Sequence, residues 1–537
     1  MEQMKKNLNI IFCALAVVLA ALMIRMFWIQ VVCGEELKQA AFRQSLVLLE
    51  GVDTRGMICD RNGSPLLGNQ TQYLYVIPRE KRNVQVSRLL ASLHARQIGG
   101  NGRQYYVYAS GQYRKDIGSR LMQQYQAYIL KTAARYEDDQ IAAGLIGYIN
   151  RRDHTGAAGL ELMCDRQLSQ SVCHMYAAAD VQGRLIPGRG LLDDSTGGAS
   201  RRGTASVKTT LNKPLQKEVE KILQDYPQDC VAIVLDRYTG DVLSMAYTPS
   251  FDPNNVEQYL KCDSDVLRNK ATQGEYAPGS VFKIIVAASA LEQGISADQR
   301  FFCSGSVCLG DISIGCKTGG SSGHGWIGME EAFAQSCNSY FVQLGQMTGA
   351  DAIRHMAKAM GLGVKPLAGY PQQSSGHIMT LQESSGAGIG NLSIGQGQTL
   401  ATPLQIARMT GIVASDGIDH GTHILLSEKT QTKRVLQKNT AQELQRMMRM
   451  VTEHGTARRL GLEDSGGRVL AAVKTGTAQY GLREENKSYG WLTGFTPCEN
   501  PEYIVTVFAG GTSTSAADAG PVYRRILDYL SSQESCN

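Results

Sequence analysis

A serine and a lysine three residues apart are the first pair in this chain with the types and spacing for nucleophilic chemistry. Ser280 follows a Pro-Gly pair, and Lys283 opens an apolar run that continues to Leu291. Because this run is apolar on almost every side, we expect a buried helix with Ser280 at its N-cap or first turn. A buried lysine loses its proton more easily, so it can serve as the base that a serine nucleophile needs. Backbone N–H groups at the helix start would stabilise an oxyanion.

Two further motifs follow in an order that strengthens this interpretation. Ser336-Cys337-Asn338 lies near the start of a helix expected over 330–347, and Lys474-Thr475-Gly476-Thr477 ends a strand expected over 469–473. Each triplet alone carries little information. The order S-x-x-K, S-x-N, K-T-G resembles the motif set of serine acyltransferases that react with penicillin, so the three motifs together predict one active site.

The elements around these motifs alternate between strands and helices. We expect strands over 207–211, 231–236, 242–247, 490–495 and 503–509, and helices over 214–223 and 522–530. The second and third strands form a hairpin around a turn at 238–240. Strands first, then many helices, then strands with a closing helix predict an α+β domain with an antiparallel sheet flanked by helices.

The region over 33–205 gives no constellation of catalytic groups. A strand ending in an Asn-Gly turn is expected over 55–63, a helical stretch over 114–143 and a short strand over 144–149. The Gly-, Arg- and Ser-rich stretch over 183–205 indicates irregular connections near a domain boundary. We interpret this region as a structural or partner-binding module.

The N-terminus has the pattern of a membrane anchor. Lys5 and Lys6 precede an apolar stretch over 8–32, which is long enough to cross a bilayer. A cleaved signal peptide is the alternative, but no small-x-small cleavage site follows the apolar core. The two lysines predict a cytoplasmic tail over 1–7 and place everything after residue 32 outside the cell.

Composition excludes several other classes of protein. The net charge is +5 without a dense basic tract, so no nucleic-acid partner is expected, and no P-loop or dinucleotide fingerprint is present. Twelve of the 13 cysteines follow the anchor, where export permits disulfides. Cys303, Cys308 and Cys316 are close enough for one local bridge but lack the paired spacing of a zinc motif. We therefore expect neither a metal site nor a cofactor.

Beyond the three motifs, the chain resembles the class B penicillin-binding proteins. The resemblance lies in Tyr276-x-Pro-Gly-Ser280 and in 231–236, Thr239-Gly240, 251–254, 395–397, 402–405 and 491–497. The anchor, 55–63 and 159–161 are similar to the N-terminal pedestal of that family. The resemblance divides the chain into a tail (1–7), a transmembrane helix (8–32), an elongated mixed pedestal that binds partners (33–205) and a transpeptidase domain (206–534).

The resemblance implies a peptidoglycan D,D-transpeptidase that cross-links stem peptides through a Ser280 acyl-enzyme and is inhibited by β-lactams. Lys283 would deprotonate Ser280, Ser336 would relay a proton to the leaving amine, and Asn338 would hold the substrate amide. Lys474 would help to keep Lys283 neutral. The terminal carboxylate would be bound by Lys474 and the K-T-G-T residues Thr475, Gly476 and Thr477. Backbone N–H groups of Ser280 and Thr477 would form the oxyanion hole.

The same resemblance suggests partners and leaves alternatives open. No second catalytic domain precedes the pedestal, so a membrane glycosyltransferase of the SEDS type is the expected partner. Cys337 fills the variable middle of its motif, and Asn212 stands where an aspartate is usual. The alternatives are a serine β-lactamase, a β-lactam-binding sensor and a catalytically idle scaffold for cell-wall assembly. The pedestal argues against a β-lactamase, and the short cytoplasmic tail argues against a sensor. The intact motifs argue against an idle scaffold.

Overall fold

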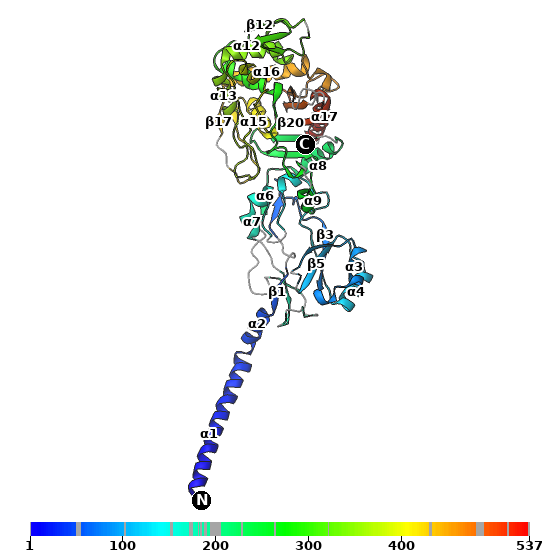
Figure 1. The fold of residues 1–537 in the computed structure, drawn as a ribbon, viewed down its shortest axis with the longest axis vertical. Helices are drawn as coiled ribbons and strands as arrows, with labels where there is room; N and C mark the ends of the chain where they lie inside the picture. The colour runs from blue at the N-terminus through cyan, green and yellow to red at the C-terminus, as the bar shows by residue number, and fades with distance from the viewer. Residues whose placement is uncertain are drawn as a thin grey trace.

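The computed structural model places a long helix, a small mixed unit and a larger globular unit one after another along the molecule (Figure 1). The structure describes residues 2–49, 55–100, 102, 104–150, 154–170, 175–180, 182, 185–186, 191–193, 206–226, 229–261, 265–320, 322–428, 432–479, 488–512 and 515–534. The stretch expected to be irregular, 183–205, lies almost entirely outside these residues.

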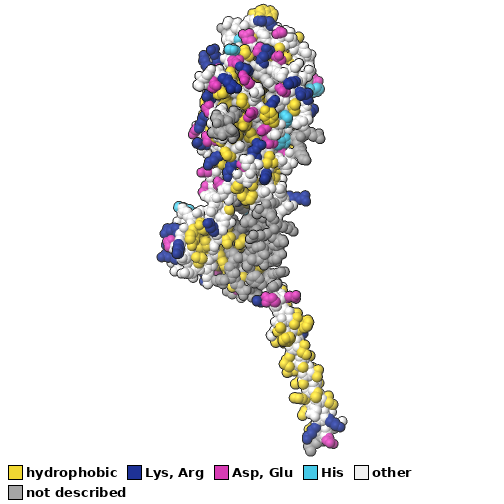
Figure 2. All heavy atoms as spheres, turned by 180° about the vertical axis from the view of Figure 1, so that it is seen from behind, with side chains coloured by type: hydrophobic (Ala, Val, Ile, Leu, Met, Phe, Trp, Pro, Cys, Tyr) yellow, Lys and Arg dark blue, Asp and Glu magenta, His cyan; other side chains and the backbone are white. Residues whose placement is uncertain are grey.

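The N-terminal helix has the length and surface of a membrane span. Helix α1 (Glu2–Phe27) continues through a π-helical turn (Trp28–Val32), and α2 (Gly34–Gln44) follows. No residue of α1 is buried, so its apolar side chains form the exposed column seen in Figure 2. At 1.5 Å per residue, Glu2–Val32 extends about 46 Å, more than the roughly 30 Å of a bilayer core.

Beyond the anchor, a four-stranded sheet with the order β4-β5-β3-β6 is packed on both faces. Its strands are β3 (Thr71–Pro78), β4 (Arg96–Gly99), β5 (Tyr105–Ser110) and β6 (Tyr128–Ala133). Tyr75 and Ile77 of β3 pack with α3 (Val84–Ala91) and α4 (Lys115–Tyr125), whereas Leu74 and Val76 pack with the β1-β7-β8 sheet. Strands β1 (Leu46–Leu48), β7 (Met175–Ala178) and β8 (Leu191–Asp193) form that second sheet.

Two of our predictions for this region are wrong. The helical stretch expected over 114–143 ends at Tyr125, because Gln126 takes a left-handed conformation (φ 55°) and the chain then forms β6 against β3. The strand expected over 144–149 is instead the helical turn α5 (Ala143–Ile146). In both places short apolar runs fit either structure in isolation, and the tertiary contacts decide.

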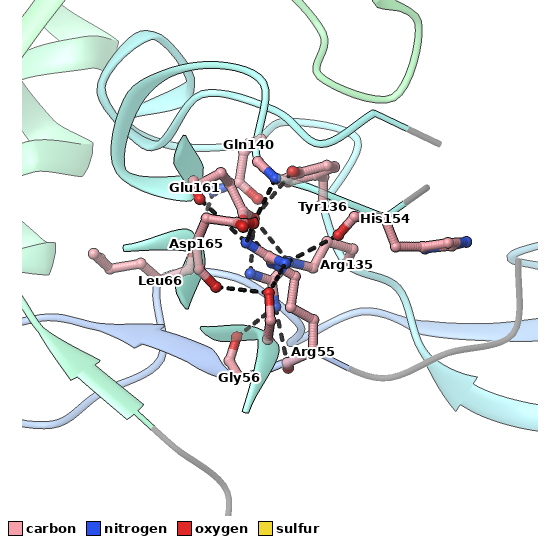
Figure 3. Close-up of polar contacts among 11 residues, drawn as sticks. Arg55, Gly56, Leu66, Arg135, Tyr136, Gln140, His154, Glu161 and Asp165 are labelled. Atoms are coloured by element: carbon pink, nitrogen blue, oxygen red, sulfur yellow. Dashed lines mark hydrogen bonds and ion pairs between the residues drawn. The ribbon is translucent and has the colours of Figure 1, made fainter. Parts of the chain in front are cut away.

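A buried ion network joins segments that are far apart in the sequence (Figure 3). The Arg55 guanidinium bonds Glu161 Oε2 (3.0 Å) and Asp165 Oδ1 (2.5 Å), and Arg135 bonds Glu161 Oε1 (2.8 Å) and the Gly56 carbonyl (2.6 Å). The Glu161 side chain is fully buried and that of Arg55 is 5% exposed. The acidic partners lie on α6 (Gly159–Met163) and α7 (Asp165–Ser169). Strand β2 (Met57–Cys59) starts beside this network and runs parallel to β9 (Ser206–Lys208).

The larger unit is built on an antiparallel five-stranded sheet with the order β11-β10-β20-β19-β18. The strands are β10 (Cys230–Asp236), β11 (Val242–Thr248), β18 (Ala472–Gln479), β19 (Ser488–Thr496) and β20 (Tyr503–Thr512). Helices α8 (Lys213–Gln224) and α17 (Ser515–Glu534) pack on one face, and α15 (Pro403–Ala414) on the other. The hairpin, the two later strands and both flanking helices are confirmed.

A helical group and a small β-insert complete this unit at the end away from the anchor (Figure 1). The helices are α10 (Lys283–Glu292), α11 (Met329–Ala334), α12 (Asn338–Thr348), α13 (Ala350–Ala359), α14 (Gly388–Ser393) and α16 (Lys438–Glu453), with α9 (Val256–Leu260) nearer the pedestal. The insert contains β12 (Arg300–Cys303), β13 (Ser306–Leu309), β14 (Ile312–Gly315) and β15 (Gly325–Gly328), paired β12-β15 and β13-β14. A two-stranded ladder of β16 (Ile418–Asp419) and β17 (Lys433–Arg434) lies elsewhere on the unit.

Candidate active site

Ser280 lies on a 3₁₀ turn (Gly279–Phe282) that leads directly into the buried helix α10. Gly279 has a φ of +56°, and a Cβ there would lie 2.6 Å from the Thr477 carbonyl oxygen of β18. Glycine is therefore required both by the backbone conformation and by the closeness of the edge strand. The turn thus holds the half-buried Ser280 beside the K-T-G strand.

Lys283 is the first residue of α10 and is fully buried. Its ammonium nitrogen donates to the Ser336 carbonyl oxygen (2.7 Å), to Ser336 Oγ (3.1 Å) and to Asn338 Oδ1 (2.8 Å). The structure therefore brings the S-x-x-K lysine onto both polar residues of the S-x-N motif. The expectation of a buried helix carrying this lysine is confirmed.

The helix expected over 330–347 is two helices, α11 and α12, with the S-x-N motif in the break between them. Ser336 has a left-handed backbone (φ 55°), and Cys337 is extended and caps α12, its sulfur accepting from the Tyr340 N–H (3.4 Å). A continuous helix would direct these side chains around its surface. The bend instead turns Ser336 and Asn338 toward Lys283.

The K-T-G motif lies inside an edge strand. This differs from our prediction, which ends the strand at residue 473, directly before the motif. β18 runs from Ala472 to Gln479 and pairs only with β19 among the described strands. Lys474 Nζ donates to Ser336 Oγ (3.2 Å) and to the Thr475 carbonyl (3.0 Å). Gly476 permits close packing, because a Cβ there would lie 3.0 Å from side-chain atoms of Val281 and Trp491.

The electrostatics of the site centre on the two buried lysines. Burial lowers the pKa of Lys283 to about 7, partly opposed by the nearby Cys337 and Cys316 sulfurs. Burial and then the charge of Lys283 lower the pKa of Lys474 well below its usual value. Both amines bond the same Ser336 hydroxyl, so their protonation is coupled. Such a pair can hold a neutral amine near neutral pH, as a general base requires.

Sequence reasoning missed two residues that support the K-T-G strand. Thr456, just after α16, shares a hydrogen bond with Thr475 through their hydroxyl oxygens (2.5 Å). Gln396 donates to the Thr477 carbonyl oxygen (3.4 Å). Gln396 lies in the Gly-Gln-Gly segment that resembles the class B penicillin-binding proteins, but the resemblance assigns it no role. No local sequence pattern marks Thr456 as part of the site. Both contacts restrain the strand beside Ser280.

Comparison with known proteins agrees with this geometry. The family model described as "Penicillin binding protein transpeptidase domain" matches residues 230–528. The chain is 30% identical over 374 residues to the peptidoglycan D,D-transpeptidase PbpA of Mycolicibacterium smegmatis, covering 63% of this chain and 75% of that protein. It is 26% identical over 558 residues to stage V sporulation protein D of Bacillus subtilis, covering 94% and 83% respectively.

A similar fold is found in a solved assembly titled "Structural coordination of polymerization and crosslinking by a peptidoglycan synthase complex". The TM-score is 0.70 at 23% identity, with 97% of each chain covered. This likeness supports the fold of the whole chain, including the pedestal and anchor. The motif geometry and the family match define a serine acyltransferase of the penicillin-binding fold. The chain belongs to the penicillin-binding protein transpeptidase family, and within it to class B.

Proposed function

We propose that this protein is a membrane-anchored peptidoglycan D,D-transpeptidase that works through an acyl-enzyme on Ser280. The observation that carries the proposal is the convergence of Lys283 and Lys474 on the Ser336 hydroxyl. Lys283 directly follows the turn that carries Ser280. A relative named as a peptidoglycan D,D-transpeptidase and the match to the transpeptidase family supply the reaction class.

In the proposed acylation step, Ser280 Oγ attacks the carbonyl carbon of the penultimate D-Ala. Neutral Lys283 takes the hydroxyl proton, and the oxyanion is bound by backbone N–H groups of Ser280 and Thr477. The proton then passes through Ser336 to the leaving D-Ala amine, and the peptide C–N bond breaks. The amine of a second stem peptide then attacks the ester carbonyl carbon, and the ester bond to Ser280 Oγ breaks. The proton that the amine loses passes to Ser280 Oγ, which restores the serine and leaves the new amide as the cross-link.

The remaining motif residues bind the substrate in this proposal. The Asn338 side chain already donates to the Gly315 carbonyl (3.0 Å) and accepts from Lys283, so it is held in one orientation for a substrate amide. Lys474 and the hydroxyls of Thr475 and Thr477 would receive the terminal carboxylate, and Gly476 leaves room beside the strand. β-Lactams, which resemble D-Ala-D-Ala, would acylate the same serine.

The test follows a fluorescent penicillin on the full chain in detergent, beside Ser280→Ala. We expect long-lived covalent labelling that disappears in Ser280→Ala, together with release of D-Ala from a stem peptide in the presence of an amine acceptor. Rapid release of hydrolysed drug would indicate a β-lactamase instead. Labelling without D-Ala release would favour a sensor, and folded protein without labelling would favour a scaffold.

We also propose that the chain crosses the membrane once, with 1–7 in the cytoplasm and the pedestal and the transpeptidase domain outside. The membrane-length helix supports the anchor, and Lys5 and Lys6 support the orientation. Reporter fusions at each terminus check it: a periplasm- or exterior-active reporter should work only at the C-terminus.

The proposed partner is a membrane glycosyltransferase of the SEDS type, supported by the fold shared with a peptidoglycan synthase complex. Co-purification that depends on the anchor and pedestal would test it.

A further inference from the structure

Four side chains with metal-binding atoms converge behind the S-x-N motif. Cys303, Cys316, His324 and Cys337 each place one such atom within 4.8 Å of the other three. They lie at the end of β12, just after β14, just before β15 and at the cap of α12. The three cysteines are buried and free, and the histidine is half-buried.

The distances within this cluster match those of ligands around one ion. Cys316 Sγ lies 3.6 Å from Cys337 Sγ and 3.6 Å from His324 Nδ1. Zinc–sulfur bonds of about 2.3 Å and zinc–nitrogen bonds of about 2.0 Å in a tetrahedron give sulfur–sulfur edges of roughly 3.8 Å and sulfur–nitrogen edges of roughly 3.6 Å. These two separations fit a common ion, and the other pairs, including those of Cys303, all lie within 4.8 Å of one another.

The surrounding backbone is shaped to let the segments approach. Gly323 has a φ of +70°, and a Cβ there would lie 2.1 Å from the Cys303 carbonyl oxygen. A Cβ on Gly319 would lie 2.9 Å from His324 Nδ1. These glycines allow the loop between β14 and β15 to fold over the cluster, where any larger residue would separate the ligands.

A backbone N–H group also faces the cluster. The Cys337 sulfur accepts a hydrogen bond from the Tyr340 N–H in the first turn of α12 (3.4 Å). Outer contacts of this kind orient metal ligands and stabilise thiolates. The start of α12 therefore supplies a donor to the cluster as well as one ligand.

We propose that Cys303, Cys316, His324 and Cys337 form a closed zinc site. Soft thiolates with one imidazole in a tetrahedral arrangement select zinc, and four protein ligands leave no open position for substrate, as in structural sites. No local sequence pattern indicates this site, since no two of these ligands form the short pairs typical of zinc motifs. This proposal departs from our expectation from the sequence that no metal is bound.

The site would fix the geometry of the S-x-N motif. Cys337 lies between Ser336 and Asn338, and the Asn338 amide is bonded to Gly315, the residue before Cys316. A zinc ion joining Cys337 to Cys316 would therefore clamp the bend, with its left-handed Ser336, to the β-insert. In this arrangement the four ligands are positioning residues, and the ion takes no part in the acyl transfer.

The first experiment measures bound metal in the full chain, purified in detergent with chelator-treated buffers. We expect about one zinc per chain by elemental analysis, retained in Cys308→Ser and reduced at least about fivefold in Cys303→Ser and Cys316→Ser. Cys308 is the matched control because it is an exposed cysteine of the same insert, on β13. Cobalt substitution should add the visible bands of a tetrahedral thiolate site.

A second measurement uses the unsubstituted chain and does not depend on any variant folding. Zinc removal with a strong chelator should lower both the melting temperature and the rate of penicillin labelling, and zinc, but not magnesium, should restore them. Absence of zinc from the isolated chain would overturn the proposal, as would a Cys316–Cys337 disulfide found by mass spectrometry. Zinc that persists in both cysteine variants, or zinc removal with no effect on melting, would overturn it as well.

Discussion

At the scale of single residues, the site depends on two lysine side chains that are buried away from solvent. Lys283 and Lys474 are both fully buried, and each bonds Ser336 Oγ. A buried charged amine is costly, so the fold favours releasing a proton from the pair. The two lysines thus prepare a base before substrate arrives, and the Ser336 hydroxyl connects them.

This coupling predicts the pH dependence of acylation. The rate constant for penicillin labelling should rise with pH through about 7, because only neutral Lys283 can accept the Ser280 proton. Lys283→Met should lower that constant by roughly 10²–10⁴-fold and remove this limb of the profile. Stopped-flow or quench measurements of labelling between pH 5 and 9 would check it, with the exposed Lys365→Met as control. A profile that is flat in the unsubstituted chain would contradict the role of Lys283.

At the scale of elements, one carboxyl joins the pedestal to the transpeptidase domain. Glu220 of α8 accepts from the Ala142 N–H before α5 (2.6 Å) and from Gln216 Nε2 (2.8 Å). Burial raises the pKa of Glu220 to about 7, and the two hydrogen bonds oppose the shift. The contact therefore changes charge state within the physiological range.

The sign of this shift predicts how stability depends on pH. The folded-state pKa of about 7 lies above the ordinary value of 4.5, so the stabilising contribution is complete below about pH 4.5 and is lost as pH rises through 7. Glu220→Gln, which keeps an acceptor oxygen, should therefore raise the free energy of unfolding at pH 8 by about 3 kcal/mol relative to its effect at pH 4.5. Thermal unfolding at the two pH values measures this. Glu218→Gln, more exposed on the same helix, should show no such difference.

At the scale of the whole molecule, the pedestal and the transpeptidase domain share one hydrophobic core. Ile58, Leu145 and Leu160, from the region we assigned to the pedestal, belong to the same buried cluster as Val231 and Phe282. The part of the pedestal around β3 has two hydrophobic clusters of its own. The part of the pedestal that contains Ile58, Leu145 and Leu160 therefore packs together with the transpeptidase domain. This shared core gives the elongated molecule of Figure 1 a continuous connection between the anchor end and the active site.

The Arg55–Glu161–Arg135 network stabilises that connection. Glu161→Ala would leave two guanidinium groups without their shared carboxylate, so we expect a loss of about 3–5 kcal/mol in the free energy of unfolding. Denaturant unfolding and limited proteolysis of the junction would measure the loss. Glu80→Gln, on an exposed turn of the pedestal, is the control. A Glu161→Ala chain as stable as the control would show that the network contributes nothing to the junction.

The apolar N-terminal helix, the order of the three motifs and most of the central sheet could be predicted from the amino-acid sequence alone. Each depends on local information: apolar length for α1, residue identity for the motifs, and strand alternation with a turn for the β10–β11 hairpin. The buried helix carrying Lys283 was predictable for the same reason. Its apolar residues leave no polar face, whatever packs around it.

Three features could not be predicted from the sequence, because they depend on tertiary contacts: the bend at Ser336, the position of K-T-G within β18 and the cysteine–histidine cluster. The bend exists because Ser336 adopts a left-handed conformation that Lys283 and Cys337 contacts stabilise, and no local pattern indicates that conformation. The K-T-G residues are part of a strand because β19 pairs with β18 along its whole length, as far as the Gln479–Ser488 pair. Cys303, Cys316, His324 and Cys337 meet because β12 and β14 end, and β15 and α12 begin, at one point. Such meetings depend on how elements pack against one another, which no short stretch of sequence encodes.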